Sequence, residues 1–164
     1  MVNELRAVRA LWYAMLLDSH GNVPIVTAFT DEVPEYRTRQ QVYEFVVSEF
    51  SKVLESGTLT KEKSASTYTR LNHWSVEMAL MRVYLNAEVY TGTPAYDKAL
   101  ALANDIVDNS PYSLSATYSE NFLVNLGPDN TEVMFAIPYD AKKDTGGHVC
   151  SQNAKWYPPV SKNY

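Results

Sequence analysis

The sequence predicts a mainly α-helical fold, an antiparallel stack of tetratricopeptide-like helices. The strongest observation is the stretch from Met78 to Leu114, in which two amphipathic segments flank a short Gly-Thr-Pro turn. Apolar residues recur there at the three- and four-residue steps of one helix face: Ala79, Val83 and Ala87, then Tyr96, Ala99, Leu100, Ala103 and Ile106. Because such a pair cannot bury its apolar face alone, the pattern indicates neighbouring helices and a scaffold that binds a partner.

The first predicted helix covers residues 4–19. Its large apolar side chains are expected to form one buried face: Leu5, Val8, Leu11, Trp12, Met15 and Leu16. Gly21 tolerates the left-handed backbone that ends a helix. Pro24 excludes a helix interior or a central strand, so we expect residues 23–27 to be extended. Residues 30–37 predict a polar loop.

The second predicted helix begins at Thr38, which fits a capping box with Gln41 three residues on. We expect it to run to about Leu54, where Ser56 and Gly57 follow and close it. Its predicted buried side chains are Val42, Phe45, Val46, Phe50 and Val53. The next two helices are predicted over residues 72–90 and 94–109, with Pro94 in the first turn of the latter.

The character of the chain changes after Pro111. Residues 115–123 fit one short helix, and the apolar run 132–139 predicts a strand or an extended packing segment. Residues 141–164 are rich in Gly, Lys, Asn, Ser and Pro and show no periodic apolar face. We therefore divide the chain into a helical scaffold, residues 1–140, and the start of an incomplete loop-rich region, residues 141–164.

The composition argues against several classes of partner. The formal net charge is -5 and no block of Lys and Arg occurs, which argues against nucleic acid or an acidic membrane surface. The single cysteine, Cys150, excludes an intrachain disulfide framework. No apolar run is long enough to predict a transmembrane helix. The charged amphipathic start differs from a secretory signal peptide, so we expect a cytoplasmic protein or a chain that lacks its natural beginning.

No catalytic or metal-binding pattern stands out, so the sequence predicts no enzyme, no cofactor and no metal site. His148 and Cys150 form the only local pair of ligand types, without a second pair. His20 and His73 lack a partner pattern such as HExxH, so a helix-end or packed histidine is favoured for both. No GxSxG motif occurs, and none of the 19 acidic residues stands out as one of a hydrolytic pair.

The best local fit to sugar recognition lies in the loop-rich region, at Asn153, Lys155, Trp156 and Tyr157. Aromatic faces stack on pyranose rings, while amide and ammonium groups bind the hydroxyls. The alternative is that the two rings plug the scaffold or pack on residues beyond it, and both interpretations stay open. Trp12 and Trp74 are expected in the core.

Four segments follow one another in a characteristic order. They are RAVRALWYAMLLDSHGNVPIVTAF, TRQQVYEFVVSEFSKVLE, ALMRVYLNAEVYTGTPAYDKALALANDIVDNSPYSL and NFLVNLGPDNTEVMFAIPYD. Over residues 4–140 the chain resembles SusD-like (RagB/SusD) proteins, the outer-membrane glycan-binding lipoproteins of gut and oral Bacteroidetes. It departs from them at Asn22, where Asp is common, and at His20, where an aromatic residue is common. Members of the family are much longer, so the chain resembles an internal or truncated portion.

The resemblance implies a non-catalytic component of a polysaccharide-utilisation system at the cell surface, held to the outer membrane by a lipid anchor absent from this chain. It implies oligosaccharide or polysaccharide as ligand and a SusC-like TonB-dependent transporter as partner. The helical half of the family mainly forms the scaffold and packs on the transporter. No sugar-binding motif of the family matches this sequence residue by residue.

A function from another class stays open, that of a helical-repeat adaptor binding a protein or peptide. Its groove would be lined by polar side chains of the inner helices. Asn72, Arg82, Asn86 and Asn104 could serve, although they fit a solvated helix face equally well.

Overall fold

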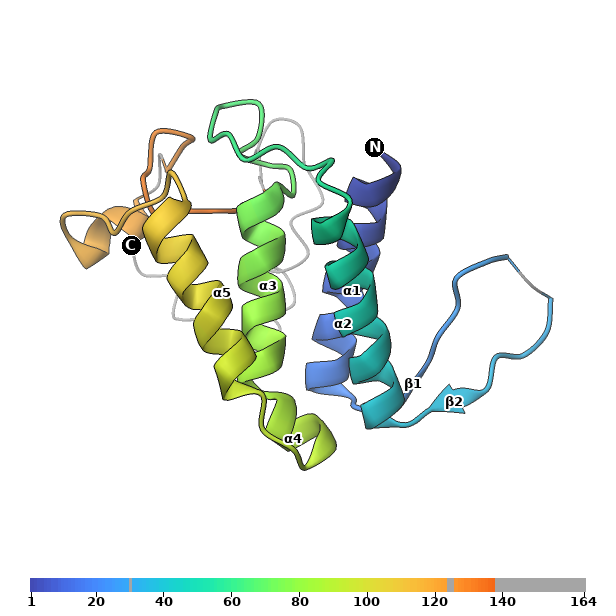
Figure 1. Cartoon of the computed structure of the whole chain (residues 1–164). Helices are drawn as coiled ribbons and strands as arrows, with labels where there is room; N and C mark the ends of the chain where they lie inside the picture. The colour runs from blue at the N-terminus through green and yellow to red at the C-terminus, as the bar shows by residue number, and fades with distance from the viewer. Residues whose placement is uncertain (30, 124–125, 138–164) are drawn as a thin grey trace, which may run out of the picture.

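Four long helices lie side by side in the structure, a computed structural model that describes residues 1–29, 31–123 and 126–137 (Figure 1). They are α1 (Val2–Ser19), α2 (Arg39–Glu55), α3 (His73–Leu85) and α5 (Tyr96–Asn109). α1 packs antiparallel on α2, and α3 packs antiparallel on α5, while α2 joins the two pairs by packing on α3. The predicted mainly α fold of stacked antiparallel helices is confirmed. Across the described residues, no helix is both long enough and apolar enough to cross a bilayer.

The smaller elements lie between and after these helices. They are β1 (Val23–Pro24), β2 (Tyr36–Arg37), α4 (Ala87–Thr91) and the 3-10 helix η1 (Tyr118–Phe122). β1 and β2 pair antiparallel, with Val23 opposite Arg37 and Pro24 opposite Tyr36. A proline is tolerated in this ladder because both strands are edges. The predicted extended segment around Pro24 and the short helix within residues 115–123 are both present.

The buried stripe of α1 combines small side chains with Leu17 and leaves out most of the large side chains that were predicted to be buried. Ala7 and Ala10 are fully buried and Leu17 nearly so, and small residues on this stripe leave room for α2 to pack against it. Leu5, by contrast, is 63% exposed and Trp12 is 53% exposed. The predicted buried face of α1 is therefore wrong for most of its large residues, including Trp12. Two apolar stripes occur at helical spacing, and the packing of α2 selects the one with alanines.

A buried acid fixes the same interface. Glu49 of α2 is 5% exposed, and its carboxylate accepts a short hydrogen bond from the guanidinium of Arg9 in α1. Arg6 lies one turn away, with its Nε 3.5 Å from the same oxygen. Paired arginines compensate the cost of burying this charge, so the two helices are held in one register.

The turn from α1 into α2 follows the prediction closely. The backbone N–H of Gln41 donates to Oγ1 of Thr38 at 3.3 Å, and the N–H of Thr38 donates to Oε1 of Gln41 at 3.0 Å, which completes the capping box. Gly21 has φ 75°, and a Cβ atom there would lie 2.7 Å from Nε of Arg39. Both the left-handed backbone and the close guanidinium thus require glycine at this position.

The helix predicted over residues 72–90 is divided at Asn86. The side-chain amide of Asn86 donates to the carbonyl of Arg82 at 3.0 Å, and α3 ends at Leu85 before the short α4 begins. Asparagine competes for backbone carbonyls in this way and so interrupts helices. Pro94 lies just before Ala95, the N-cap of α5, and not in its first turn as predicted.

Side-chain amides and the carboxylate of Glu132 form hydrogen bonds that hold residues 110–123 and 126–137 in place. Oδ1 of Asn130 accepts from the N–H groups of Glu132 and Val133, each at 2.9 Å. The N–H of Ala136 donates to the carbonyl of Tyr68 at 3.2 Å, so the segment lies against the loop that follows α2. Residues 132–137 form no strand, so that alternative of the prediction is wrong for them, and Phe135 packs against the core. Residues 138 and 139 lie outside the described part.

Candidate functional site

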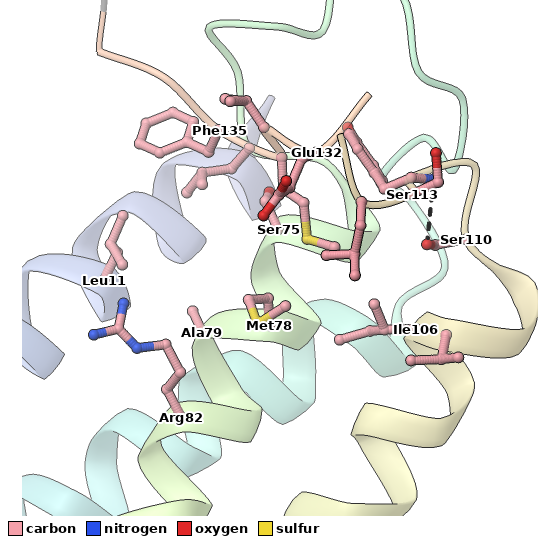
Figure 2. A pocket seen from close by; sticks show the side chains of 16 residues that line it. Leu11, Ser75, Met78, Ala79, Arg82, Ile106, Ser110, Ser113, Glu132 and Phe135 are labelled. Atoms are coloured by element: carbon pink, nitrogen blue, oxygen red, sulfur yellow. Dashed lines mark hydrogen bonds between the residues drawn. The ribbon is translucent and has the colours of Figure 1, made fainter. Parts of the chain in front are cut away.

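An apolar cleft of about 900 Å³ opens between α3, α5 and the segment after η1. Figure 2 shows side chains from these elements and Leu11 of α1 around it. The lining residues are Leu11, Leu71, Ser75, Met78, Ala79, Arg82, Ile106, Val107, Ser110, Tyr112, Ser113, Leu114, Glu132, Val133, Met134 and Phe135. Most of these side chains are aliphatic, and only Tyr112 and Phe135 among them are aromatic.

The floor of the cleft is formed where α3 packs on α5, and it includes Ile106, which is 5% exposed. Met78 and Arg82 are one turn apart on α3 and therefore point to the same side, as Figure 2 shows. Val107 and Leu114 are 79% and 84% exposed, so the far wall faces solvent. The apolar lining suits hydrocarbon side chains.

Two polar side chains of the cleft, Glu132 and Tyr112, form hydrogen bonds within the fold. The carboxylate of Glu132 accepts from the N–H of Ser115 at 3.1 Å and from the amide of Asn121 at 2.7 Å. The hydrogen bond from Ser115 is the main reason why the pKa of Glu132 is lowered. The hydroxyl of Tyr112 accepts from Asn72 at 2.7 Å. Sugar sites combine polar groups with exposed aromatic rings, and the two aromatic side chains of this cleft, Tyr112 and Phe135, are only partly exposed.

The polar groove expected of an adaptor is also not formed by its predicted residues. Asn72 is fully buried as the N-cap of α3. Asn86 uses its amide to end that helix. Arg82 lines the apolar cleft, and Asn104 lies exposed on α5. Two of the four residues thus have roles within the fold, and the described residues give the adaptor no positive support.

A second group of functional side chains lies at the start of α3, where the sequence predicted only a packed histidine. His73 and Glu77 are four residues apart on α3, and Asp105 of α5 lies against them. Nε2 of His73 is 3.5 Å from Oε2 of Glu77. Burial, followed by the hydrogen bond and charge of Asp105, raises the pKa of Glu77 to about 7, while burial lowers the pKa of His73. The spacing of His73 and Glu77 was a usable signal, but nothing in the sequence pointed to Asp105.

Trp74 anchors the loop beside this group. Its ring is 2% exposed and its indole N–H donates to the carbonyl of Lys61 at 2.9 Å, which confirms its predicted place in the core. The residues predicted to bind sugar, Asn153, Lys155, Trp156 and Tyr157, lie outside the described residues. So do His148 and Cys150. Their predicted roles stay predictions.

Known SusD-like proteins are similar to most of this chain. No family profile matches the chain. It is 28% identical over 141 residues to the starch-binding protein SusD of Bacteroides thetaiotaomicron, which covers 86% of this chain and 25% of SusD. A crystal structure of a SusD superfamily protein from the same organism matches 88% of this chain and 32% of its own, with a TM-score of 0.69 and 26% identity.

A third relative was solved with a sugar. Surface glycan-binding protein A of Bacteroides thetaiotaomicron, in complex with laminarihexaose, matches 74% of this chain and 24% of its own length, with a TM-score of 0.59 and 24% identity. The chain thus spans about a quarter to a third of the length of the proteins it matches. The resemblance to the SusD-like family is confirmed over this part. SusD-like proteins are non-catalytic binding proteins, in agreement with the prediction that the chain is not an enzyme.

Proposed function

We propose that this chain is the helical scaffold of a SusD-like protein that captures glycans at the bacterial cell surface for a SusC-like, TonB-dependent transporter of the outer membrane. The observation that carries the proposal is the similarity to starch-binding SusD over 141 residues, which make up 86% of this chain. Glycan binding is a property of the relatives, and its transfer to this chain is our inference.

The structure supports a division of labour within such a protein. Apolar residues of α2 and α3 form the core of the helix pairs, and Phe50 and Val76 among them are fully buried. The cleft on this scaffold is mostly aliphatic, and its two aromatic side chains are only partly exposed. We therefore assign sugar contact to the loop-rich region, with Trp156 and Tyr157 as stacking platforms and Asn153 and Lys155 as hydroxyl partners.

The proposal is tested by tryptophan fluorescence of the 164-residue chain, titrated with soluble starch oligosaccharides and with laminarihexaose. The chain contains three tryptophans. Trp74 is buried and Trp12 is half exposed, so Trp12→Phe removes the background from the scaffold surface. We expect a saturable change that persists in Trp12→Phe and is lost in Trp156→Ala.

Two outcomes count against the assignment. A fluorescence response that is lost in Trp12→Phe instead would place the sugar on α1. No response to any sugar would contradict the proposal that this chain binds glycans. The transporter partner is tested separately, by co-purification of the 164-residue chain with outer-membrane transporters. Failure to recover a TonB-dependent transporter would contradict that part of the proposal alone.

A further inference from the structure

Three side chains able to bind a metal converge where α3 begins and α5 ends. His73 and Glu77 project from the same side of α3, one turn apart, and Asp105 reaches them from α5. One ligand atom from each lies within 4.8 Å of the other two. Glu77 and Asp105 are 28 positions apart in the sequence, and the antiparallel packing of α5 on α3 brings them together.

Glu77 supplies the observation that points to a ligand. Its side chain is only 4% exposed, and among the described residues its Oε2 has no hydrogen-bond partner. The nearest ring nitrogen of His73 is 3.5 Å away, beyond the range of a good hydrogen bond. A buried carboxylate oxygen without a partner is costly, and a cation bound between His73 and Asp105 would compensate that cost.

We propose that His73, Glu77 and Asp105 bind a divalent transition-metal cation of the zinc class. Ligands at the usual zinc distances in a tetrahedron are about 3.4 Å apart, and the pair His73 and Glu77 already stands at 3.5 Å. The ligand atoms of the other two pairs lie within 4.8 Å of each other. Each of these two distances therefore needs to shorten by at most about 1.4 Å to reach the tetrahedral value. The partly exposed Asp105 can provide this by side-chain rotation, and its exposure leaves the fourth position open to water.

The donor set favours this class of cation over calcium or magnesium. One imidazole nitrogen with two carboxylates suits zinc, manganese or iron, whereas calcium and magnesium prefer oxygen ligands only. The amide of Asn109 donates to Oδ1 of Asp105 at 2.7 Å. Hydrogen bonds of this kind orient metal-binding carboxylates, so Asn109 holds Asp105 as a positioning residue.

Two positive charges compete with a metal ion for this site, the ammonium of Lys61 and a proton on Glu77. The ammonium of Lys61 lies 5.1 Å from the ring centroid of Trp74 and lowers the pKa values of both His73 and Glu77. Lys61 is exposed and flexible enough to turn away. The other competitor is a proton on Glu77. Zinc binding must displace any proton held there, because a carboxylate binds a metal in its deprotonated form.

The test uses the 164-residue chain with His148→Gln and Cys150→Ser in the background, so that those two residues bind no metal. Metal-stripped protein is titrated with zinc chloride by calorimetry and with cobalt, whose visible absorption reports coordination geometry. We expect one ion per chain and a tetrahedral cobalt spectrum. Glu77→Gln, His73→Gln and Asp105→Asn are each expected to weaken binding at least tenfold.

The matched control is Asp108→Asn, an exposed aspartate on the same helix as Asp105, which should leave the affinity unchanged. Saturable binding that survives in Glu77→Gln would overturn the proposal, as would the absence of saturable binding. The absence of binding would instead indicate that Glu77 and Asp105 share a proton as a structural pair. Glu77→Gln is isosteric, and its far-UV circular dichroism shows whether a loss of binding reflects unfolding. If Glu77→Gln unfolds, the zinc stoichiometry and the cobalt spectrum of the parent chain test the proposal in its place.

Discussion

The side-chain amide of Asn72 donates a hydrogen bond of 2.7 Å to the hydroxyl of Tyr112 and so joins the start of α3 to the segment that follows α5. Asn72 is fully buried, and its Oδ1 also accepts from the backbone N–H of Ser75 at 2.9 Å. One side chain thus caps α3 and ties the second helix pair to the wall of the apolar cleft. The contribution of the Asn72–Tyr112 hydrogen bond to stability can be measured by substitution.

Tyr112→Phe is expected to lower the free energy of unfolding by about 1–3 kcal/mol, because it leaves the buried amide of Asn72 without its acceptor. Urea unfolding measures the change. Tyr118→Phe is the matched control, since Tyr118 is 80% exposed, and should change stability by less than about 0.5 kcal/mol. Equal effects of the two substitutions would show that the bond to Asn72 contributes nothing.

Phe50→Ala is expected to destabilise the fold by about 3–5 kcal/mol, because Phe50 is fully buried in α2 and its removal leaves a cavity. Phe122→Ala makes the same chemical change at a side chain that is 68% exposed. Thermal unfolding should show a large drop for the first variant and almost none for the second. A similar drop in both would contradict the assignment of the core.

Thr38→Ala is expected to cost about 1 kcal/mol, since it removes the acceptor for the N–H of Gln41 at the start of α2. Thr38→Ser keeps the hydroxyl and should retain most of the stability. Chemical unfolding of the two variants side by side separates the cap from the loss of a methyl group. If serine and alanine cost the same, the capping bond has no measurable role.

The pH dependence of stability should depend on Glu77 in metal-free protein. Its pKa is raised from 4.5 to about 7 in the folded state. Between these values the folded state holds a proton that the unfolded chain releases, so the free energy of unfolding falls as the pH rises. Glu77→Gln cannot lose this proton, so its free energy of unfolding should not fall in the same way. Between pH 4.5 and about 7, its stability relative to the parent chain should rise by up to about 3 kcal/mol.

The measurement is urea unfolding at a series of pH values with a chelator present. His73 acts in the opposite sense. Its pKa is lowered from 6.5, so its contribution is lost as the pH falls. Both proteins retain His73, and their difference therefore reports mainly Glu77. Parallel pH profiles of the two proteins would mean that Glu77 titrates normally.

The sequence by itself determined the features that depend on neighbours along the chain. The capping box of Thr38, the left-handed Gly21 and most buried positions of α2 follow from local hydrogen bonding, backbone freedom and helical period. All of these were predictable, whereas the buried Glu49 was not. The order of the four segments also identified the family, because that order is a property of the chain alone.

Only the tertiary structure decided which of two apolar stripes on α1 is buried, since this depends on how closely α2 approaches Ala7 and Ala10. Packing also created the apolar cleft and brought Asp105 to His73 and Glu77. These relationships join residues on different helices, whose relative rotation is set by the sum of many contacts and leaves no periodic signal in the sequence.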